Sequence, residues 1–241
     1  MRLTASTDPG CKHDDNQDCY RAGRLSDGTF WVILCDGMGG VSAGGKASMM
    51  AVDFLNKCID KKLSDIMTPE GVRDFMLEAI RDCNALIYKN SRDAHNLITM
   101  GTTLVFAVVR GALAQVAHAG DSRAYIVGRK IKQVTHDHSV VQELLDSKKI
   151  TSEQARNHPN KNIITSALGV EDSIRVDYNE QHISKGDSLL ICTDGLSNMI
   201  TDEDIMQVVQ ECDFYKTADI LVKMAREAGG YDNITAVLLS M

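Results

Sequence analysis

The chain has 241 residues, 44% of them hydrophobic and 24% charged, and its formal net charge is -7. This composition excludes a disordered chain and is sufficient for a large core. The acidic balance argues against a nucleic-acid partner, because broad nucleic-acid binding depends on a basic surface. No linker or repeat divides the sequence, so we predict a single domain over residues 1–241.

The seven cysteines contain no CxxC pair, which fits thiols in a reducing compartment better than a disulfide framework. The first residues lack the apolar segment of a signal peptide, and no apolar run reaches the length of a membrane span. We therefore expect a cytoplasmic protein without a membrane partner.

The first half of the chain predicts one strand followed by two helices. Residues 29–35 are apolar and β-branched over the length of a strand. Residues 46–60 carry apolar side chains at three- and four-residue spacing, which predicts a helix. A second helix is predicted to begin after Thr68 as its N-cap, with Pro69 at its first position.

The second half of the chain predicts mostly strands. Strands are expected at 102–109, 112–118, 123–127, 188–193 and 233–239, and the short gaps after 109 and 127 indicate hairpins. Thr201 and Asp204 form a capping box that opens one helix, and a further helix over 217–228 ends at Gly229. Antiparallel strands with inserted helix pairs favour an α+β architecture of stacked layers.

Four aspartates share one local context, in which an apolar strand meets a turn: Asp36, Asp121, Asp194 and Asp232. Turn formation alone explains any single Asp-Gly pair. Four such positions favour a shared function, because strand ends in layered sheets can converge at one edge. Converging carboxylates must then share cations or protons.

An all-oxygen ligand set selects hard cations such as Mg²⁺ or Mn²⁺, and His and Cys show no zinc-like spacing in the sequence. Two such ions about 3.5 to 4 Å apart, bridged by a water, generate a nucleophile for attack on phosphorus. Glycines at positions 37, 39 and 40 would let backbone carbonyls approach a metal. The sequence therefore predicts that Asp36 holds metal.

Eight short motifs occur between Asn16 and Asn233 in the order NQD, DGMGG, GDSR, DHS, HPNKN, ALG, TDG and DN. This series resembles the metal-dependent serine/threonine protein phosphatases of type 2C, the PPM family, in their bacterial single-domain form. The resemblance implies a four-layer αββα sandwich, with two central antiparallel β-sheets flanked by antiparallel helix pairs and metals at one end. Residues 137–170 look like the family's flap, a kind of loop that gates access and chooses substrates.

The resemblance also implies roles for individual residues. Asp36 matches the aspartate that bridges two metals, and Gly37 matches the residue that contributes its carbonyl. Asp194 and Asp232 match the further ligands of the first metal, so these three aspartates are the expected catalytic centre. Asp18 matches a carboxylate that acts near the other metal through water.

Asp121 matches the ligand of a third, weaker metal site in bacterial members. The expected cofactors are thus two Mn²⁺ or Mg²⁺ ions and a third, weaker one. The expected reaction is hydrolysis of phosphoserine and phosphothreonine in proteins by a metal-bridging hydroxide. The partners would be phosphorylated substrates of a Ser/Thr kinase, with the phosphatase acting as a monomer.

Two positions depart from the family pattern. His13 stands where the family has an arginine that grips the phosphate, so His13 is either the phosphate-binding residue or only a surface residue. Val41 stands where many bacterial members have histidine, which removes one proton donor near the leaving group.

These departures leave two alternatives open. One is a pseudophosphatase that keeps the fold for binding a partner, although every metal-position carboxylate remains. The other is a phosphatase dedicated to a single phosphoserine regulator protein, which an altered phosphate grip would suit.

Overall fold

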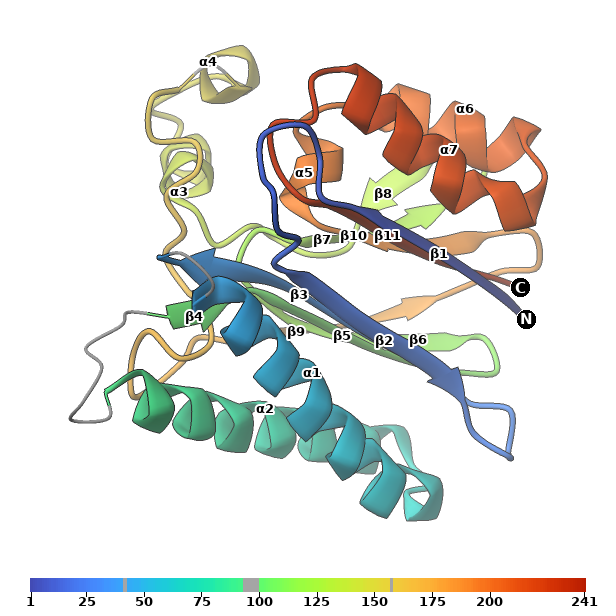
Figure 1. Cartoon of the computed structure of the whole chain (residues 1–241). Coiled ribbons are helices and arrows are strands. Elements are labelled where there is room, and N and C mark those ends of the chain that lie inside the picture. The colour runs from blue at the N-terminus through green and yellow to red at the C-terminus, as the bar shows by residue number, and fades with distance from the viewer. Residues whose placement is uncertain (41–42, 93–99, 157) are drawn as a thin grey trace.

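The protein is built around two stacked antiparallel β-sheets (Figure 1). The computed structural model describes residues 1–40, 43–92, 100–156 and 158–241. Within these residues, one sheet has the strand order β1 (Arg2–Asp8), β11 (Ile234–Ser240), β10 (Ser188–Cys192), β7 (Arg123–Val127) and β8 (Ile131–Gln133). The other has the order β2 (Asp18–Arg24), β3 (Phe30–Gly39), β5 (Leu104–Arg110), β6 (Leu113–Ala119) and β9 (Asp177–His182), with β4 (Met100–Thr102) paired to β3.

Helices cover the outer face of each sheet. The pair α1 (Ala43–Lys62) and α2 (Pro69–Ser91) lies below the second sheet in Figure 1, with a 3-10 turn at Leu63–Asp65 between the two helices. The pair α6 (Asp202–Glu211) and α7 (Phe214–Glu227) lies above the first sheet, beside the short α5 (Asp194–Ser197). The resulting helix–sheet–sheet–helix order confirms the predicted αββα sandwich.

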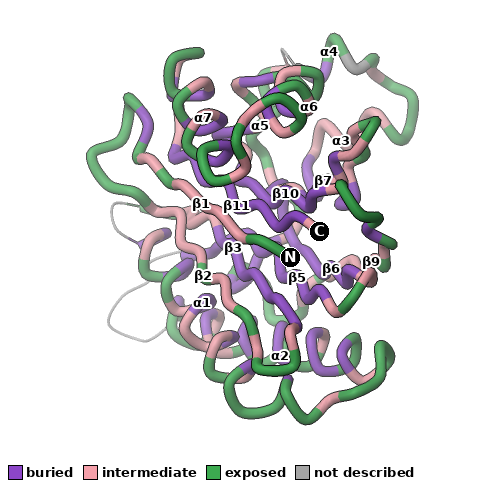
Figure 2. The backbone as a smooth tube through the Cα atoms, turned by 90° about the vertical axis from the view of Figure 1, so that its right-hand side faces the viewer, coloured by how far each residue is buried: buried purple, intermediate pink, exposed green. Residues whose placement is uncertain are grey.

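Strand β3 shows why several strands read as continuous apolar runs. Its side chains alternate between two buried layers, because both faces of a central strand are covered. Phe30, Val32 and Leu34 belong to the core between the sheets. Trp31, Ile33 and Cys35 belong to the core against α1 and α2. Figure 2 shows this buried centre running through both sheets, with exposed residues on the outer helices.

The predicted helix starts are present. The Thr68 hydroxyl accepts a hydrogen bond from the Gly71 N–H, and Pro69 begins α2. Thr201 and Asp204 form the reciprocal capping box of α6. These local signals are decided within one turn of helix, which is why the sequence reveals them.

Three predicted boundaries were wrong. Strand β3 does not end before Asp36 but continues to Gly39, because Gly37, Met38 and Gly39 pair with β4. The strand predicted over 102–109 is divided between β4 and β5. The last helix begins at Phe214 rather than at residue 217, since Asp213 caps it by accepting from the Tyr215 N–H.

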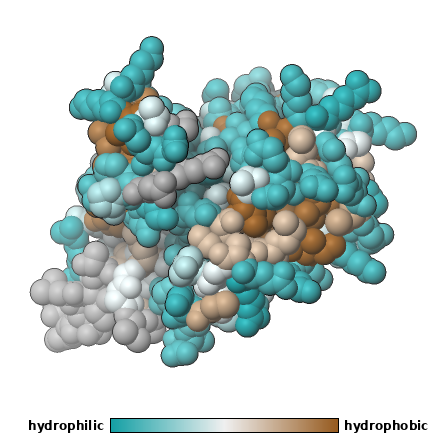
Figure 3. All heavy atoms as spheres, turned by 90° about the horizontal axis from the view of Figure 1, so that it is seen from above, coloured by the Kyte–Doolittle hydropathy of each residue, from teal (hydrophilic) through white to brown (hydrophobic). Residues whose placement is uncertain are grey.

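A small flap projects at the left-hand end of the sandwich in Figure 1 and contains α3 (Val140–Asp146) and α4 (Ser152–Arg156). The view from above in Figure 3 shows mostly hydrophilic atoms at the surface, with apolar atoms gathered in limited areas. In the part of the chain that the structure describes, no helix has the length and apolar character needed to cross a bilayer.

Candidate active site

The predicted site residues come from chain segments that meet at one end of the sandwich. Asp18 begins β2 and pairs in register with Asp36 on β3. Asp194 follows the end of β10, and Asp232 precedes the start of β11, which is the neighbour of β10. Asp121 lies in the connection between β6 and β7. Antiparallel pairing thus places strand starts and strand ends at the same edge.

A cavity of about 420 Å³ opens among these segments. Its lining includes six of the seven predicted site residues: His13, Asp36, Gly37, Asp121, Asp194 and Asp232. Asp18, the seventh, is not in the lining and lies behind it as the strand partner of Asp36. The structure therefore brings together side chains that are up to 219 positions apart between His13 and Asp232.

Asp36 is fixed by its own backbone. Its N–H donates to the Thr103 hydroxyl at 3.0 Å, and its carbonyl accepts from the Thr102 hydroxyl and the Thr103 N–H, each at 2.8 Å. Burial, followed by repulsion from neighbouring carboxylates with Asp18 first, raises the pKa of Asp36 well above its usual range.

Gly37 follows Asp36 where the backbone leaves no room for a side chain. A Cβ at this position would overlap the backbone carbonyl of Gly44 in α1 and lie 2.8 Å from the carbonyl oxygen of Gln17. The Gly37 N–H donates to that same Gln17 carbonyl at 3.2 Å. Glycine is therefore required here by the close approach of two backbone segments.

The Asp18 carboxylate is held on one side only. Its Oδ2 accepts from the hydroxyls of Thr193 at 2.9 Å and Thr235 at 2.6 Å. Its Oδ1 is buried and has no hydrogen-bond partner among the described residues. Burial raises the pKa of Asp18 to about 7, against the lowering effect of the two hydroxyls.

Asp194 shows the same one-sided arrangement. Its Oδ2 accepts from Asn198 Nδ2 at 3.0 Å, whereas its buried Oδ1 has no partner in the described part of the chain. Burial and then the charge of Asp232 raise the pKa of Asp194 to about 6. An orphaned carboxylate oxygen beside other carboxylates is unfavourable unless a cation or proton joins it.

Asp121 is the most enclosed of the lining aspartates, with 8% of its surface exposed. Burial and the charge of Asp194 raise its pKa well above the usual range. The next residue, Ser122, shares a hydrogen bond of 2.7 Å with the Thr103 hydroxyl, which also binds Asp36. Asp121 and Asp36 are thus held by one network.

His13 lies at the mouth of the cavity. Its Nε2 is 3.6 Å from Asp232 Oδ1, and both side chains are about half exposed. Lys12 points elsewhere, because its Nζ lies over the Tyr231 ring at 5.7 Å from the centroid. Val41, the second departure from the family pattern, lies outside the described residues.

The flap reaches the same cavity through Asn162 and Ile164. A second cavity of about 620 Å³ lies between the flap and the body, and both Asp121 and Asp194 line it. At its base, Arg123 donates from Nε and Nη2 to the Asp137 carboxylate at 2.6 to 3.0 Å. The flap is therefore joined to the body directly beside the aspartates.

Sequence reasoning missed the residues that support the site. Asn233 is 4% exposed and holds the segment that carries His13, since its amide donates to the carbonyls of Pro9 and Asp15. Thr193 and Thr235, which bind Asp18, are fully buried. The signal available was the place of Thr193 in the motif TDG and of Asn233 in the motif DN, whereas Thr235 lies outside both motifs.

The sequence model of the family described as protein phosphatase 2C matches residues 12–238. The chain belongs to the protein phosphatase 2C family. Among curated relatives, it is 37% identical over 241 residues to the serine/threonine phosphatase stp of Listeria monocytogenes, covering 99% of this chain and 95% of that protein. It is 38% identical over 244 residues to the protein phosphatase PhpP of Streptococcus pneumoniae, covering 100% of this chain and 98% of that protein.

Solved structures agree with this assignment. The serine/threonine phosphatase Stp1 from Staphylococcus aureus superposes with a TM-score of 0.94 at 30% identity, covering 100% of this chain and 95% of that chain. The catalytic domain of the serine/threonine phosphatase PstP in complex with two manganese ions superposes with a TM-score of 0.85 at 30% identity, covering 98% and 96%.

These similarities confirm the predicted family and the predicted enzyme class, a metal-dependent serine/threonine protein phosphatase. They do not favour the pseudophosphatase alternative, because the relatives are named as phosphatases and the similarity covers nearly their full length.

Proposed function

We propose that this protein phosphatase 2C member removes phosphate from phosphoserine and phosphothreonine in proteins at the acidic cavity. The observation that carries the proposal is the set of carboxylates gathered there, with two orphaned oxygens, Asp18 Oδ1 and Asp194 Oδ1. Burial first, with repulsion from neighbouring carboxylates as a further cause, raises the pKa values of Asp18, Asp36, Asp121 and Asp194, which favours a bound cation or proton at the cluster.

The donor set fits Mg²⁺ or Mn²⁺. The available ligands are carboxylate and carbonyl oxygens, which hard divalent cations prefer. We propose that Asp36, Gly37, Asp194 and Asp232 hold two ions, with Asp18 acting behind them, and that Asp121 holds a third, weaker one. When bound, such ions supply an activated water for attack on phosphorus and neutralise charge on the phosphoryl oxygens.

The chain's own residues orient the site. The backbone of Asp36 is fixed by Thr102 and Thr103, and its side chain lines the cavity. Thr193 and Thr235 keep one oxygen of Asp18 occupied, which leaves the other free to face the cations. This arrangement prepares the carboxylates before any ligand arrives.

We further propose that His13 binds the substrate phosphate. Its position at the cavity mouth, beside Asp232, supports this role over that of an unrelated surface residue. Histidine gains positive charge as the pH falls between 8 and 5, whereas arginine is always charged and offers two parallel donors. Binding through His13 should therefore be strongest in mild acid.

The substrate protein would enter between the flap and the body, where the two cavities meet at Asp121 and Asp194. The relatives are named as serine/threonine phosphatases, which supports phosphoproteins made by a Ser/Thr kinase as substrates. We propose that the protein works as a monomer in a reducing compartment, which its seven free cysteines support.

The test is hydrolysis of a phosphothreonine peptide and of p-nitrophenyl phosphate by the metal-stripped protein, with Mn²⁺ and with EDTA. Activity should require Mn²⁺ and should be lost in Asp36→Ala while the variant stays folded, because the change removes a proposed ligand and no core side chain. The matched control is Asp219→Ala, an exposed aspartate on α7, which should behave as wild type. Full activity after thorough stripping would refute the proposal.

The role of His13 is tested by following KM and kcat separately from pH 5.5 to 8.5. His13→Arg should lower KM for p-nitrophenyl phosphate and flatten the pH dependence of KM. The gained charge-assisted contact with the phosphate is worth about 1 to 3 kcal/mol of binding free energy at most. His13→Ala should raise KM in acid and change little in alkali. Unchanged KM in both variants at every pH would make His13 a surface residue only.

A further inference from the structure

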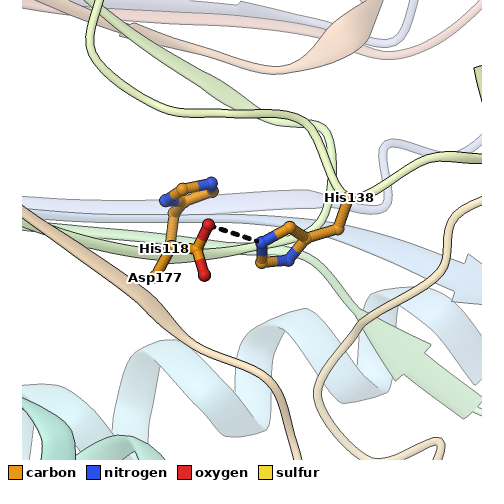
Figure 4. Close-up of side chains that lie close together, drawn as sticks. All are labelled: His118, His138 and Asp177. Carbon is orange, nitrogen blue, oxygen red and sulfur yellow. Dashed lines mark ion pairs between the residues drawn. The ribbon is translucent and has the colours of Figure 1, made fainter. Parts of the chain in front are cut away.

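A buried cluster beside the acidic cavity contains His118, His138 and Asp177, shown in Figure 4. The two histidine side chains are 0% and 1% exposed. Their rings stack with centroids 4.9 Å apart and an angle of 24° between planes. Asp177 begins β9 and pairs in register with His118 on β6, so all three side chains meet where the sheet ends below the flap.

His138 is attached to the residue before Asp121 by two hydrogen bonds. The His138 N–H donates to the Gly120 carbonyl at 2.9 Å, and the Gly120 N–H donates to His138 Nδ1 at 3.3 Å. Gly120 itself has a positive φ of 108°, and a Cβ there would lie 2.7 Å from the Thr103 Cβ. The backbone that leads into Asp121 is therefore held between His138 and Thr103.

The hydrogen bonds fix which nitrogen of His138 carries its proton. Because Nδ1 accepts from Gly120, the proton of the neutral ring is on Nε2, which is buried, has no hydrogen-bond partner among the described residues and lies 3.3 Å from Asp177 Oδ2 as an ion-pair contact. Burial lowers the pKa of His138 below its ordinary value, which favours the neutral ring. Arg175 approaches the same Asp177 carboxylate at 3.3 Å.

This pattern decides between two uses of the cluster. One ligand atom from each of the three residues lies within 4.8 Å of the others, which is a spacing compatible with a metal ion. A metal on His138 Nε2 would require Nδ1 to carry the proton, and the Gly120 N–H already points at Nδ1. The cluster is therefore better suited to holding the backbone than to binding a cation.

We infer that His138, which contacts Asp177, is a positioning residue: it holds the backbone of Gly120 and thereby keeps the carboxylate of the next residue, Asp121, in place. The inference rests on the proposed role of Asp121 as ligand of the third, weaker ion. Asp121 is the one residue assigned to the third ion in that proposal, so the affinity for this ion should depend on where its carboxylate is held. Loss of a supporting contact of this kind costs about ten- to a hundredfold in metal affinity.

Two substitutions at His138 separate positioning from general packing. In His138→Asn the amide oxygen occupies the place of Nδ1 and can still accept from the Gly120 N–H. In His138→Gln the polar group lies one bond further out, near the place of Nε2, so the side-chain bond from the Gly120 N–H is lost while the backbone bond to the Gly120 carbonyl remains. The full chain is titrated with Mn²⁺ and free Mn²⁺ is measured by electron paramagnetic resonance, with Asp121→Ala as reference.

The expected result is that His138→Gln lowers the affinity for the third Mn²⁺ by about tenfold or more and leaves the affinity for the first two unchanged. Asp121→Ala should give the same pattern. His138→Asn should stay within about threefold of wild type, which a purely structural role would not predict. Wild-type binding in His138→Gln, or equal loss of all ions in both variants, would overturn the inference. If Asp121→Ala itself left the third ion unchanged, the third-site assignment would be wrong and the inference would fall with it.

Asp177→Ala gives a second test if His138→Gln does not fold. This change leaves both bonds between His138 and Gly120 in place and removes the carboxylate, 30% exposed, that contacts His138 and also accepts from Arg175. It should weaken the third ion a few-fold while the first two ions bind as in wild type. No change in the third ion would overturn the inference.

Discussion

Replacing Asp194 with asparagine tests whether the burial of a charged carboxylate, together with repulsion from Asp232, destabilises the metal-free protein. Burial and the neighbouring Asp232 raise the pKa of Asp194 from 3.8 to about 6. A rise of about two pH units corresponds to about 3 kcal/mol at high pH. This is an upper limit, because the asparagine also loses part of its hydration on burial. The variant keeps its hydrogen bond from Asn198, since an amide oxygen can replace Oδ2.

We therefore expect metal-free Asp194→Asn to be about 1 to 3 kcal/mol more stable than wild type at pH 8. For a chain of this length that is about 2 to 4 °C in Tm per kcal/mol. The folded-state pKa lies above the unfolded one, so the wild type loses stability as the pH rises from about 4 through 6. The advantage of the variant should accordingly vanish near pH 4.

The assay is thermal denaturation in EDTA at pH 4, 6 and 8, repeated with Mn²⁺. With Mn²⁺ the order should reverse, because only the wild type keeps the full ligand set. Asp219→Asn on the exposed side of α7 is the matched control and should show no pH-dependent gain. A variant no more stable than wild type at pH 8 in EDTA, or equally more stable at pH 4, would refute the reasoning.

Three further changes have defined outcomes. Gly37→Ala should lower the free energy of unfolding by about 1 to 3 kcal/mol, because the added Cβ overpacks the site. Gly40→Ala is the control and should not change stability, since no described atom lies within 4 Å of its Cβ. Both variants are measured by thermal denaturation. Thr235→Val removes a hydrogen bond that lowers the pKa of Asp18, so Mn²⁺ affinity at pH 7 should fall about tenfold and recover in part at pH 9. Arg123→Ala breaks an ion pair whose Asp137 side chain is buried and whose Arg123 side chain is 25% exposed, and it should cost about 3 kcal/mol on denaturation. A loss below 1 kcal/mol would count against that pair.

Local signals explain how much of the fold the sequence predicts. The caps at Thr68 and Thr201 depend on neighbours within four residues, and the apolar runs of β3 and β10 follow from burial on both faces. Strands β1, β2 and β9 were not predicted, because their residues are mostly half-buried and mixed in polarity. These are edge strands, and they form because each pairs with a neighbouring strand rather than because of their own hydrophobic pattern.

The candidate site shows the same division. The aspartates stand out in sequence because a carboxylate at the end of an apolar run is conspicuous, as at Asp36 and Asp194. The supporting contacts do not, because the bonds from Thr235 to Asp18 and from Gly120 to His138 span 217 and 18 positions. Their partners become known only when the two sheets are brought together.

The most direct test of the central claim is an anomalous difference map from crystals of the metal-stripped protein soaked in Mn²⁺. The account predicts two strong peaks within coordination distance of Asp36, with Asp194 and Asp232 as further ligands, and a weaker peak at Asp121. Absence of peaks at these aspartates, or a strong peak at His138 in their place, would contradict it.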